Sequence, residues 1–412
     1  MIPDAGRVLE RIDELFALAP GEGGGATRPA FSEAEARAML LVAGWAREAG
    51  LEAAVDPHGN LWCLPQGDAP CVTGGSHVDT VPDGGRYDGP LGTVLAVEAA
   101  ARVGGNRGVL VCAAEEASRF GAGTLGSRTM TGKISDEDLS RLRDATGRDA
   151  LSVRSAYLDF LRELPRMERA PLERISSHVE AHIEQRADLR DRDLSLGVAT
   201  TVAGPVRHRL RFVGEVAHAG ETPVARRRDA LCAAAETVLL AERLGQRYAP
   251  ETTATAGTFE IRPNSLTSIP GEADVGLDIR GVRPGRARLL LEELLGGARE
   301  AAEKRGVRLE ERPLSASEPT EMDEAMVTAF EDACARLGVS CGRCVSFAGH
   351  DAQHLAAVAP TALVFVASEN GVSHAPGEAV AGRDVGAALA VLSALVEGLQ
   401  RERTPQEAGG RR

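Results

Sequence analysis

The chain has 412 residues, of which 43% are hydrophobic and 26% are charged. This length exceeds the roughly 250–300 residues that a single core usually serves, so two or three domains are expected. A formal net charge of −13 without a basic stripe argues against a nucleic-acid-binding protein, and there is no run of about eighteen apolar residues to span a bilayer. The charge fits a small polar substrate better. Seven scattered cysteines, with a lone CGRC motif, favour a reducing compartment, so we expect a cytoplasmic protein.

The first part of the chain alternates helical and strand-like segments. Residues 1–18 have periodic apolar residues interrupted by acids and bases, which predicts an amphipathic helix rather than a signal peptide. Apolar runs at residues 71–73 and 108–114 predict buried strands, and residues 91–103 between them predict a helix. This order is typical of a sheet covered by helices.

Residues 177–185, SHVEAHIEQ, alternate more strictly than the other runs. If they form a strand, then His178, Glu180, His182 and Glu184 share one face, because successive side chains of a strand point to opposite sides. Polar groups are therefore expected on one side of a central strand.

The pattern changes in the middle of the chain, which predicts the order strand, helix, strand, strand, helix. The segments are residues 206–213, 223–244, 253–261, 273–279 and 284–305. These segments are enough for a compact α+β unit.

The first pattern then resumes. It predicts helices at residues 325–337 and 349–358, a buried strand at residues 361–367 and a polar tail after about Arg401. We therefore expect a mixed-sheet α/β domain built from residues 1–196 and 313–412, with an α+β domain, residues 197–312, inserted into it.

Several groups that could bind metal follow predicted strands, which is where open α/β sheets gather ligands. They are His77, Asp79, Asp88, Glu115, Glu116 and His374, with His182 inside its own strand. Histidine and carboxylate together suit zinc and related metals. A hydrolytic two-metal site also needs a bridging carboxylate, for which Asp88 is a candidate, and a base, for which the adjacent glutamates are candidates. Asp79 could hydrogen-bond an imidazole ligand.

Each feature alone has an ordinary explanation. An HxD motif is common by chance, and two adjacent glutamates usually belong to a solvated face. His182 could be a satisfied histidine within a strand, and His350 or His354 could face solvent on a helix. The occurrence of all these groups in matching positions favours a metal site.

The motifs resemble those of the di-zinc aminoacylase and carboxypeptidase-like metallohydrolases, and in particular their hydantoinase/carbamoylase subfamily. This subfamily includes N-carbamoyl-L-amino acid hydrolases, β-ureidopropionases and allantoate amidohydrolases. The blocks that carry the resemblance are, in chain order, GSHVDTVPDGGRYDGPLG, AAEEASRFGAGTLGSR, HIEQ, HAGETPVARRRDAL, IPGEADVGLDIR, AGHDAQ and GVSHAPGE. The resemblance implies a catalytic domain of the di-zinc exopeptidase type with an inserted lid that also mediates dimerisation.

The resemblance also implies a ligand set. One metal ion would be held by His77 and His182, and the other by Glu116 and His374. Asp88 would bridge the two ions. The histidine within HIEQ is similar to the amidohydrolases, whereas related peptidases tend to carry an acid there.

Two residues would take part in the reaction itself. Glu115 would be the general base, and His218 of the HAG motif would reach into the partner subunit's site to stabilise the oxyanion. Thr222 could cap a following helix, and Pro223 suits a first helical turn, so the loop that carries His218 would be fixed. Alternatively HAGETP is merely a helix start, which would explain Thr222 and Pro223 but not His218.

Other residues would contact the substrate. Arg280 would pair bidentately with a substrate carboxylate, although it could also be an ordinary arginine on a strand surface. Gln185 would bind the substrate near the metal ions, although it could be a polar strand end. His350 in the AGHDAQ block, and Thr267 just before the IPGEADVGLDIR block, are also expected at the substrate.

The chain departs from the family pattern on the substrate side. Thr267 stands where relatives usually have Asn, Arg186 follows HIEQ in place of the usual Gly-Pro, and Ala375 stands where Asn is frequent. The ligand set is intact, so the departures concern which substrate is cleaved.

We therefore expect a binuclear metal-dependent amidohydrolase that cleaves a linear C–N amide, namely the carbamoyl (ureido) group of an N-carbamoyl amino acid or an allantoate-like substrate. An N-acyl amino acid or dipeptide hydrolase on the same site is the alternative, followed by a non-catalytic small-molecule binding protein. The cofactors would be two divalent ions per subunit, zinc first and manganese, cobalt or nickel otherwise. The assembly would be a homodimer.

Overall fold

The computed structural model describes residues 5–403. Contacts group the chain into two units. The first contains the chain up to Thr200, the segment Glu321–Cys344 and the chain from Gly349, and the second contains Thr201–Thr320 and Val345–Ala348. The sequence predicts domain boundaries after residue 196 and before residue 313. These boundaries remain a proposal.

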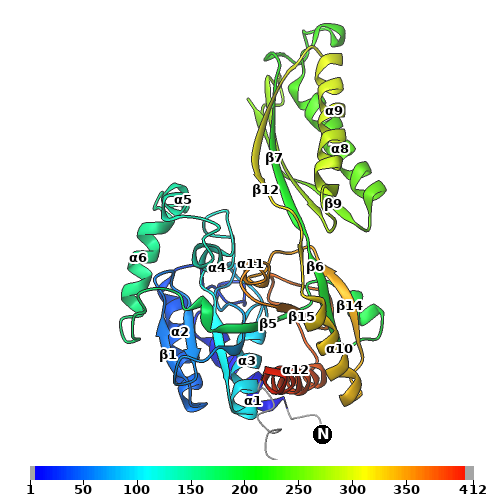
Figure 1. Cartoon of the computed structure of the whole chain (residues 1–412). Coiled ribbons are helices and arrows are strands. Elements are labelled where there is room, and N and C mark those ends of the chain that lie inside the picture. Colours follow the sequence, from blue (N-terminus) through cyan, green and yellow to red (C-terminus); the bar gives the residue numbers. More distant parts are fainter. Residues whose placement is uncertain (1–4, 404–412) are drawn as a thin grey trace, which may run out of the picture. The chain divides into compact units, whose positions relative to one another are not determined.

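A nine-stranded mixed sheet lies at the centre of the first unit (Figure 1). The strand order is β1-β2-β4-β3-β5-β15-β6-β13, and β14 also pairs with β6. The strands are β1 (Glu52–Val55), β2 (Leu61–Leu64), β3 (Cys71–Gly75), β4 (Arg107–Val111), β5 (Ile175–Ile183), β6 (Leu196–Val202), β13 (Thr320–Glu321), β14 (Cys341–Ser346) and β15 (Thr361–Val366). The mixed-sheet α/β fold predicted from the sequence is confirmed.

Four neighbouring strands of this sheet, β4, β3, β5 and β15, run parallel to one another. Their carboxyl ends therefore meet along one edge, the place where open α/β sheets bind ligands. The candidate metal ligands end or follow these strands. Segments nearly 300 residues apart, such as those of His77 and His374, are brought together by the strand order.

Helices cover this sheet. They are α1 (Gly6–Ala17), α2 (Glu33–Glu48), α3 (Pro90–Val103), α4 (Leu125–Met130), α5 (Asp136–Arg141), α6 (Ala150–Phe160), η1 (Leu172–Arg174), α7 (Asp188–Asp191), α10 (Glu324–Leu337), α11 (Ala352–Leu355) and α12 (Gly382–Arg403). The predicted amphipathic helix near the N-terminus is α1, which buries Val8, Ile12 and Leu15. Between residues 5 and 403, no helix is both long and apolar enough to cross a membrane.

Glycine allows one helix to approach the central strand closely. α3 packs against β3 and β5, and Gly92 in its first turn faces the backbone of β5. A Cβ atom at Gly92 would lie 1.8 Å from the Ala181 carbonyl oxygen, so any side chain at this position forces the helix away from the sheet.

The second unit is built on a four-stranded antiparallel sheet in the order β12-β7-β11-β9, with two long helices on one face (Figure 1). The elements are β7 (Gly204–Val213), β8 (Ala217–His218), η2 (Val224–Arg226), α8 (Ala230–Tyr248), β9 (Thr252–Arg262), β10 (Ser268–Ile269), β11 (Glu272–Gly281), α9 (Arg286–Lys304) and β12 (Arg308–Ala316). Alternate residues of β7 and β11 are buried, as in a sheet with one covered face. Phe212, Val275 and Leu290 belong to the core between this sheet and its helices.

Some predicted elements of this unit were wrong in detail. The helix expected over residues 223–244 begins at Ala230, because the Asp229 side chain accepts the Cys232 N–H and caps it there. Thr222 and Pro223 therefore do not start that helix, and a short 3-10 turn, η2, follows Pro223 instead. The strand β12 was not predicted, since its charged and largely exposed residues lack the apolar alternation of a covered strand.

Two further expectations concern the end of the chain. The helix predicted over residues 349–358 is confined to Ala352–Leu355. The polar tail predicted after Arg401 falls mainly outside the described residues, since α12 is assigned through Arg403.

The close packing of α3 on β5 predicts opposite effects for two helical glycines. Gly92→Ala should lower the free energy of unfolding by about 1–3 kcal/mol, because the added methyl group overpacks the helix against the sheet. Gly44→Ala in α2 has no atom within 4 Å of its new Cβ, so the gain in helix propensity should raise stability by up to about 1 kcal/mol. Denaturant unfolding of both variants measures this, and equal effects would contradict the packing argument.

Candidate metal centre

The first candidate ligand, His77, follows β3 and is almost fully buried. Its Nδ1 lies 3.1 Å from the Asp79 carbonyl oxygen, so this nitrogen carries the proton and donates it. The Nε2 atom lies 3.5 Å from Asp88 Oδ1, and it has no hydrogen-bond partner within residues 5–403. An imidazole held in this tautomer, with a buried unpaired Nε2, is arranged as a metal ligand is.

Asp88 reaches His77 because the residue that follows it is a glycine. Gly89 has a φ of 82°, and a Cβ atom there would lie 2.5 Å from the His77 ring. The Asp88 carboxylate lies among three imidazoles, with Oδ1 3.0 Å from His182 Nε2 and Oδ2 3.2 Å from His374 Nε2. Burial alone would raise the pKa of Asp88, but His182, His374 and His77 hold it well below its ordinary value.

The two further histidines come from β5 and from the loop after β15. His182 Nδ1 donates to the Ile183 carbonyl oxygen at 3.0 Å, which turns Nε2 towards Asp88. His374 has a φ of 57°, a left-handed conformation that is uncommon for a residue with a side chain. Its Nε2 lies 3.4 Å from Glu116 Oε1, and its contact with Asp88 and the nearby Glu116 raise its pKa to about 9.

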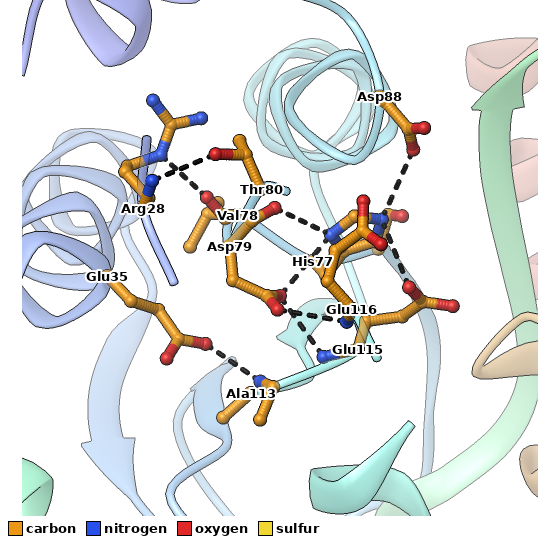
Figure 2. A network of polar contacts seen from close by, with 12 residues as sticks. Arg28, Glu35, His77, Val78, Asp79, Thr80, Asp88, Ala113, Glu115 and Glu116 are labelled. Atoms are coloured by element: carbon orange, nitrogen blue, oxygen red, sulfur yellow. Dashed lines mark hydrogen bonds and ion pairs between the residues drawn. The ribbon is translucent and has the colours of Figure 1, made fainter. Parts of the chain in front are cut away.

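Glu115 and Glu116 follow β4 and are oriented by Asp79. The Asp79 carboxylate accepts the Glu115 N–H at 3.1 Å and the Glu116 N–H at 2.9 Å (Figure 2). Glu115 Oε2 lies 3.8 Å from His77 Nε2. Burial raises the pKa of Glu115 well above the usual carboxyl value, and burial with the adjacent Asp88 charge raises the pKa of Glu116 to about 7. Asp79 thus contacts His77 mainly through its carbonyl oxygen and both glutamates through its carboxylate.

These side chains form two groups that share one member. His77, Asp88 and His182 form the first group, and Asp88, Glu116 and His374 form the second, with the ligand atoms of each group within 4.8 Å of one another. Two mixed groups of histidine and carboxylate that share one carboxylate fit a pair of divalent cations better than an ion-pair network. The buried His77 and His182 rings each donate their Nδ1–H to a backbone carbonyl oxygen, which leaves Nε2 to bind a metal ion.

Several residues that support the site were not found from the sequence. Glu378 Oε2 accepts the Tyr87 N–H at 2.6 Å and the Asp88 N–H at 3.0 Å, and Ser373 Oγ donates to Asp88 Oδ2 at 3.1 Å. Glu180, on the same face of β5 as His182, accepts the Ala352 N–H at 2.6 Å. Glu378 and Ser373 lie in the GVSHAPGE block, and Glu180 lies on the polar face of residues 177–185, but neither pattern indicates a supporting role.

Two predicted substrate contacts lie in the first unit. Gln185 Nε2 is 3.4 Å from Asp88 Oδ2. His350 is buried with its ring edge-on to the His182 ring, at 4.7 Å between centroids, and burial lowers its pKa well below the ordinary value. His354 is also buried, with its Nε2 2.9 Å from Thr124 Oγ1. The alternative that His350 or His354 faces solvent is therefore wrong.

Three predicted residues, His218, Thr267 and Arg280, belong to the second unit. Ser268 of β10 pairs with His218 of β8, so Thr267 and His218 are close neighbours. His218 is exposed and its Nδ1 accepts the Gly220 N–H at 3.1 Å, which places the proton of the neutral ring on Nε2. The roles expected for these residues remain predictions.

Arg280 is held by its neighbours within this unit. Its Nε donates to Asp278 Oδ1 at 2.7 Å and its Nη2 to Asp278 Oδ2 at 3.2 Å, while its Nη1 donates to the Phe347 carbonyl oxygen at 2.6 Å. Hydrogen bonds therefore fix the Arg280 guanidinium, unlike that of an ordinary arginine on a strand surface. One N–H on each terminal nitrogen is left over by these contacts.

Known proteins resemble this chain over almost its whole length. A family model described as Peptidase family M20/M25/M40 matches residues 74–398. An N-carbamoyl-L-amino acid amidohydrolase from Geobacillus stearothermophilus is 35% identical over 383 residues, covering 90% of this chain and 93% of that protein. An allantoate amidohydrolase from Bacillus subtilis is 30% identical, covering 94% and 96%. A solved amidase of the hydantoinase/carbamoylase family from Burkholderia multivorans has a TM-score of 0.84, with 30% identity and 96% and 97% covered.

The shared position of Asp88 predicts the effect of its removal. Asp88→Ala should reduce bound zinc from about two equivalents per subunit to less than about one, because both ligand groups lose a carboxylate. Elemental analysis after zinc saturation and dialysis gives the count. Asp68→Ala, at an exposed bend, is the control and should keep both equivalents. Unchanged zinc in Asp88→Ala would mean that Asp88 is not a shared ligand.

Proposed function

The chain belongs to peptidase family M20/M25/M40, and on this basis we propose that it removes the carbamoyl group from a small N-carbamoyl amino acid or an allantoate-like compound. It is a metal-dependent hydrolase of linear amides. Two proteins that it resembles over at least 90% of its length are named amidohydrolases. The observation that carries the proposal is the buried Asp88 carboxylate, which two ligand groups share, with the largely buried carboxyl group of Glu115 beside them.

The ligand set supports two divalent ions, which we propose to be zinc. His77 and His182 would hold one, Glu116 and His374 the other, and Asp88 both. When bound, such ions polarise the substrate carbonyl and lower the pKa of water from 15.7 towards about 7. Manganese, cobalt and nickel accept the same mixture of imidazole and carboxylate, so the donor set alone fits all four metals.

Glu115 is the proposed proton carrier. Its carboxylate would take the proton of the attacking water and then pass it to the departing nitrogen, so that the amide C–N bond breaks as the new C–O bond forms. Burial, which raises the pKa of Glu115, brings this group closer to the pH at which it can both accept and release a proton. For a carbamoyl substrate the products are the free amino acid and carbamate, which breaks down to ammonia and carbon dioxide.

Other side chains would position the substrate. Arg280, oriented by Asp278, still has N–H groups for a substrate carboxylate. Gln185 lies beside Asp88 and is proposed to bind the substrate near the metal ions, with His350 and Thr267 as further proposed contacts. The Nε2–H of His218 is suited to donate to the oxyanion.

Cleavage of an N-acyl amino acid or a dipeptide is the alternative, because the same reaction applies to any linear amide. The histidine within HIEQ favours an amidase. A substrate panel on the zinc-reconstituted enzyme decides between them: N-carbamoyl-L-α-amino acids, N-carbamoyl-β-alanine, allantoate and N-acetyl amino acids. We expect ammonia release with kcat/KM at least about 100-fold above amine release from acyl substrates, as a polar contact to the carbamoyl NH₂ would give. Preferential acyl cleavage would overturn the carbamoyl proposal.

The same assays on one enzyme variant separate the chemical step from metal binding. Glu115→Gln should lower kcat by about 10²- to 10⁴-fold while zinc content stays at the wild-type level. Glu137→Gln, at an exposed position in α5, should leave kcat unchanged.

We propose in addition that the enzyme is a homodimer in which His218 acts in the partner's site. Mixing His218→Ala with Glu115→Gln subunits after dissociation tests this. If His218 acts across the interface, the mixture should regain about one quarter of wild-type activity, because half the dimers are mixed and each has one intact site. Recovery close to zero, with mixed dimers shown by native mass spectrometry, would place His218 in its own subunit's site.

A further inference from the structure

The backbone that carries Glu115 and Glu116 begins with a strained residue. Ala114 has a φ of 54°, in the left-handed region that residues with a side chain rarely adopt. Such a conformation persists only where the surroundings impose it. The turn at Ala114 directs the next two N–H groups towards the Asp79 carboxylate, and this direction sets where both glutamate side chains start.

A carboxylate outside the predicted site holds Ala114 in place. Glu35 Oε1 accepts the Ala114 N–H at 2.8 Å, although the two residues are 79 positions apart in the chain. Figure 2 shows that the Glu35 and Asp79 side chains both point towards the stretch of backbone that follows β4. Three consecutive N–H groups, those of Ala114, Glu115 and Glu116, thus end on two carboxylates.

The other oxygen of Glu35 is also occupied. Oε2 accepts the N–H of Phe31, at 2.5 Å, and Phe31 too has a left-handed φ, of 53°. The side chain is completely buried. Because both oxygens accept backbone N–H groups, an amide at this position would have to direct its NH₂ group at one of them.

A role in starting helix α2 does not account for these contacts. Ser32 already caps the helix, since its Oγ accepts the Glu35 N–H at 3.2 Å. In a capping box the Glu35 side chain would accept the Ser32 N–H. The Ser32 N–H donates instead to the Pro29 carbonyl oxygen at 3.1 Å. The Glu35 side chain therefore does not close a capping box: one oxygen accepts the Phe31 N–H before the helix, and the other reaches the distant Ala114 N–H.

A buried cation lies alongside the two carboxylates. Arg28 is fully buried, and its Nε donates to the Val78 carbonyl oxygen at 2.7 Å, between His77 and Asp79 in the chain (Figure 2). Burial lowers the pKa of Arg28 to about 10, against the opposing effect of Asp79 and Glu35, so the guanidinium stays charged at neutral pH. Its charge offsets part of the cost of burying Glu35 beside Asp79.

We propose that Glu35 is a positioning residue for the reaction: by holding Ala114 in its left-handed conformation, it sets the direction of Glu115 as proton carrier and of Glu116 as metal ligand. The proposal rests on the proposed function for the roles of these two glutamates. It links the N-terminal segment, in which no site residue was expected, to the chemistry at the end of β4.

The test compares Glu35→Gln with Ser32→Ala. Both variants perturb the same helix end, but Ser32→Ala leaves the Glu35 to Ala114 contact intact. For Glu35→Gln we expect about 10- to 100-fold losses in kcat and in zinc affinity, with KM nearly unchanged, as for other residues that orient metal-site groups. Ser32→Ala should keep kcat and zinc affinity within about twofold of wild type while its Tm falls. Zinc affinity is measured by chelator competition without substrate.

A lower Tm in Glu35→Gln with wild-type kcat and zinc affinity would overturn the proposal, since it would show a purely structural carboxylate. If Glu35→Gln does not fold, Glu35→Asp decides by the same two measurements, because its shorter side chain cannot span both N–H groups; wild-type values in both would overturn the proposal. A wild-type enzyme inactive on every carbamoyl substrate would end the proposed function, while the zinc titrations would still test Glu35.

Discussion

The arrangement of the site depends on one buried carboxylate among three imidazoles. Asp88 lies within 3.5 Å of a nitrogen of His77, His182 and His374, which come from three separate parts of the chain. A carboxylate in this position is stable only if positive charge surrounds it, from protonated imidazoles or from metal ions. The orientation of His77 and His182, each with Nδ1 donating to a carbonyl oxygen, leaves the Nε2 atoms for metal.

The loops that carry the candidate ligands are held by further buried carboxylates rather than by regular secondary structure. Asp79 accepts the N–H groups of Glu115 and Glu116, Glu378 accepts the N–H of Asp88, and Glu35 accepts that of Ala114. Each contact joins segments distant in the chain. Side chains that accept these N–H groups fix the backbone of the loops, and a site with fixed ligand distances requires this rigidity.

Particular residues show where interpretation of the sequence failed. Thr222 and Pro223 have the residue types of a helix start, but Asp229 caps the helix, because several segments in a row can satisfy a local capping rule and packing selects one of them. His354 occupies a polar segment and yet is buried against Thr124, 230 positions away. Glu35 has the residue type of an N3 capping position, and nothing in its spacing indicates that its side chain instead reaches the turn after β4.

The sequence alone determined the fold class and the chemical type of the site, because apolar periodicity and the identity of metal-ligating residues are local properties of the chain. His77, Asp88, Glu116, His182 and His374 were candidates by residue type and position, and the resemblance to a known family implied that they form one ligand set. The tertiary structure alone revealed the supporting roles of Glu378 and Glu35, since these side chains accept backbone N–H groups that almost any residue could supply. Such contacts depend on the parallel order of β4, β3, β5 and β15. The residues that they join are far apart in the chain and have no fixed spacing that could predict the contact.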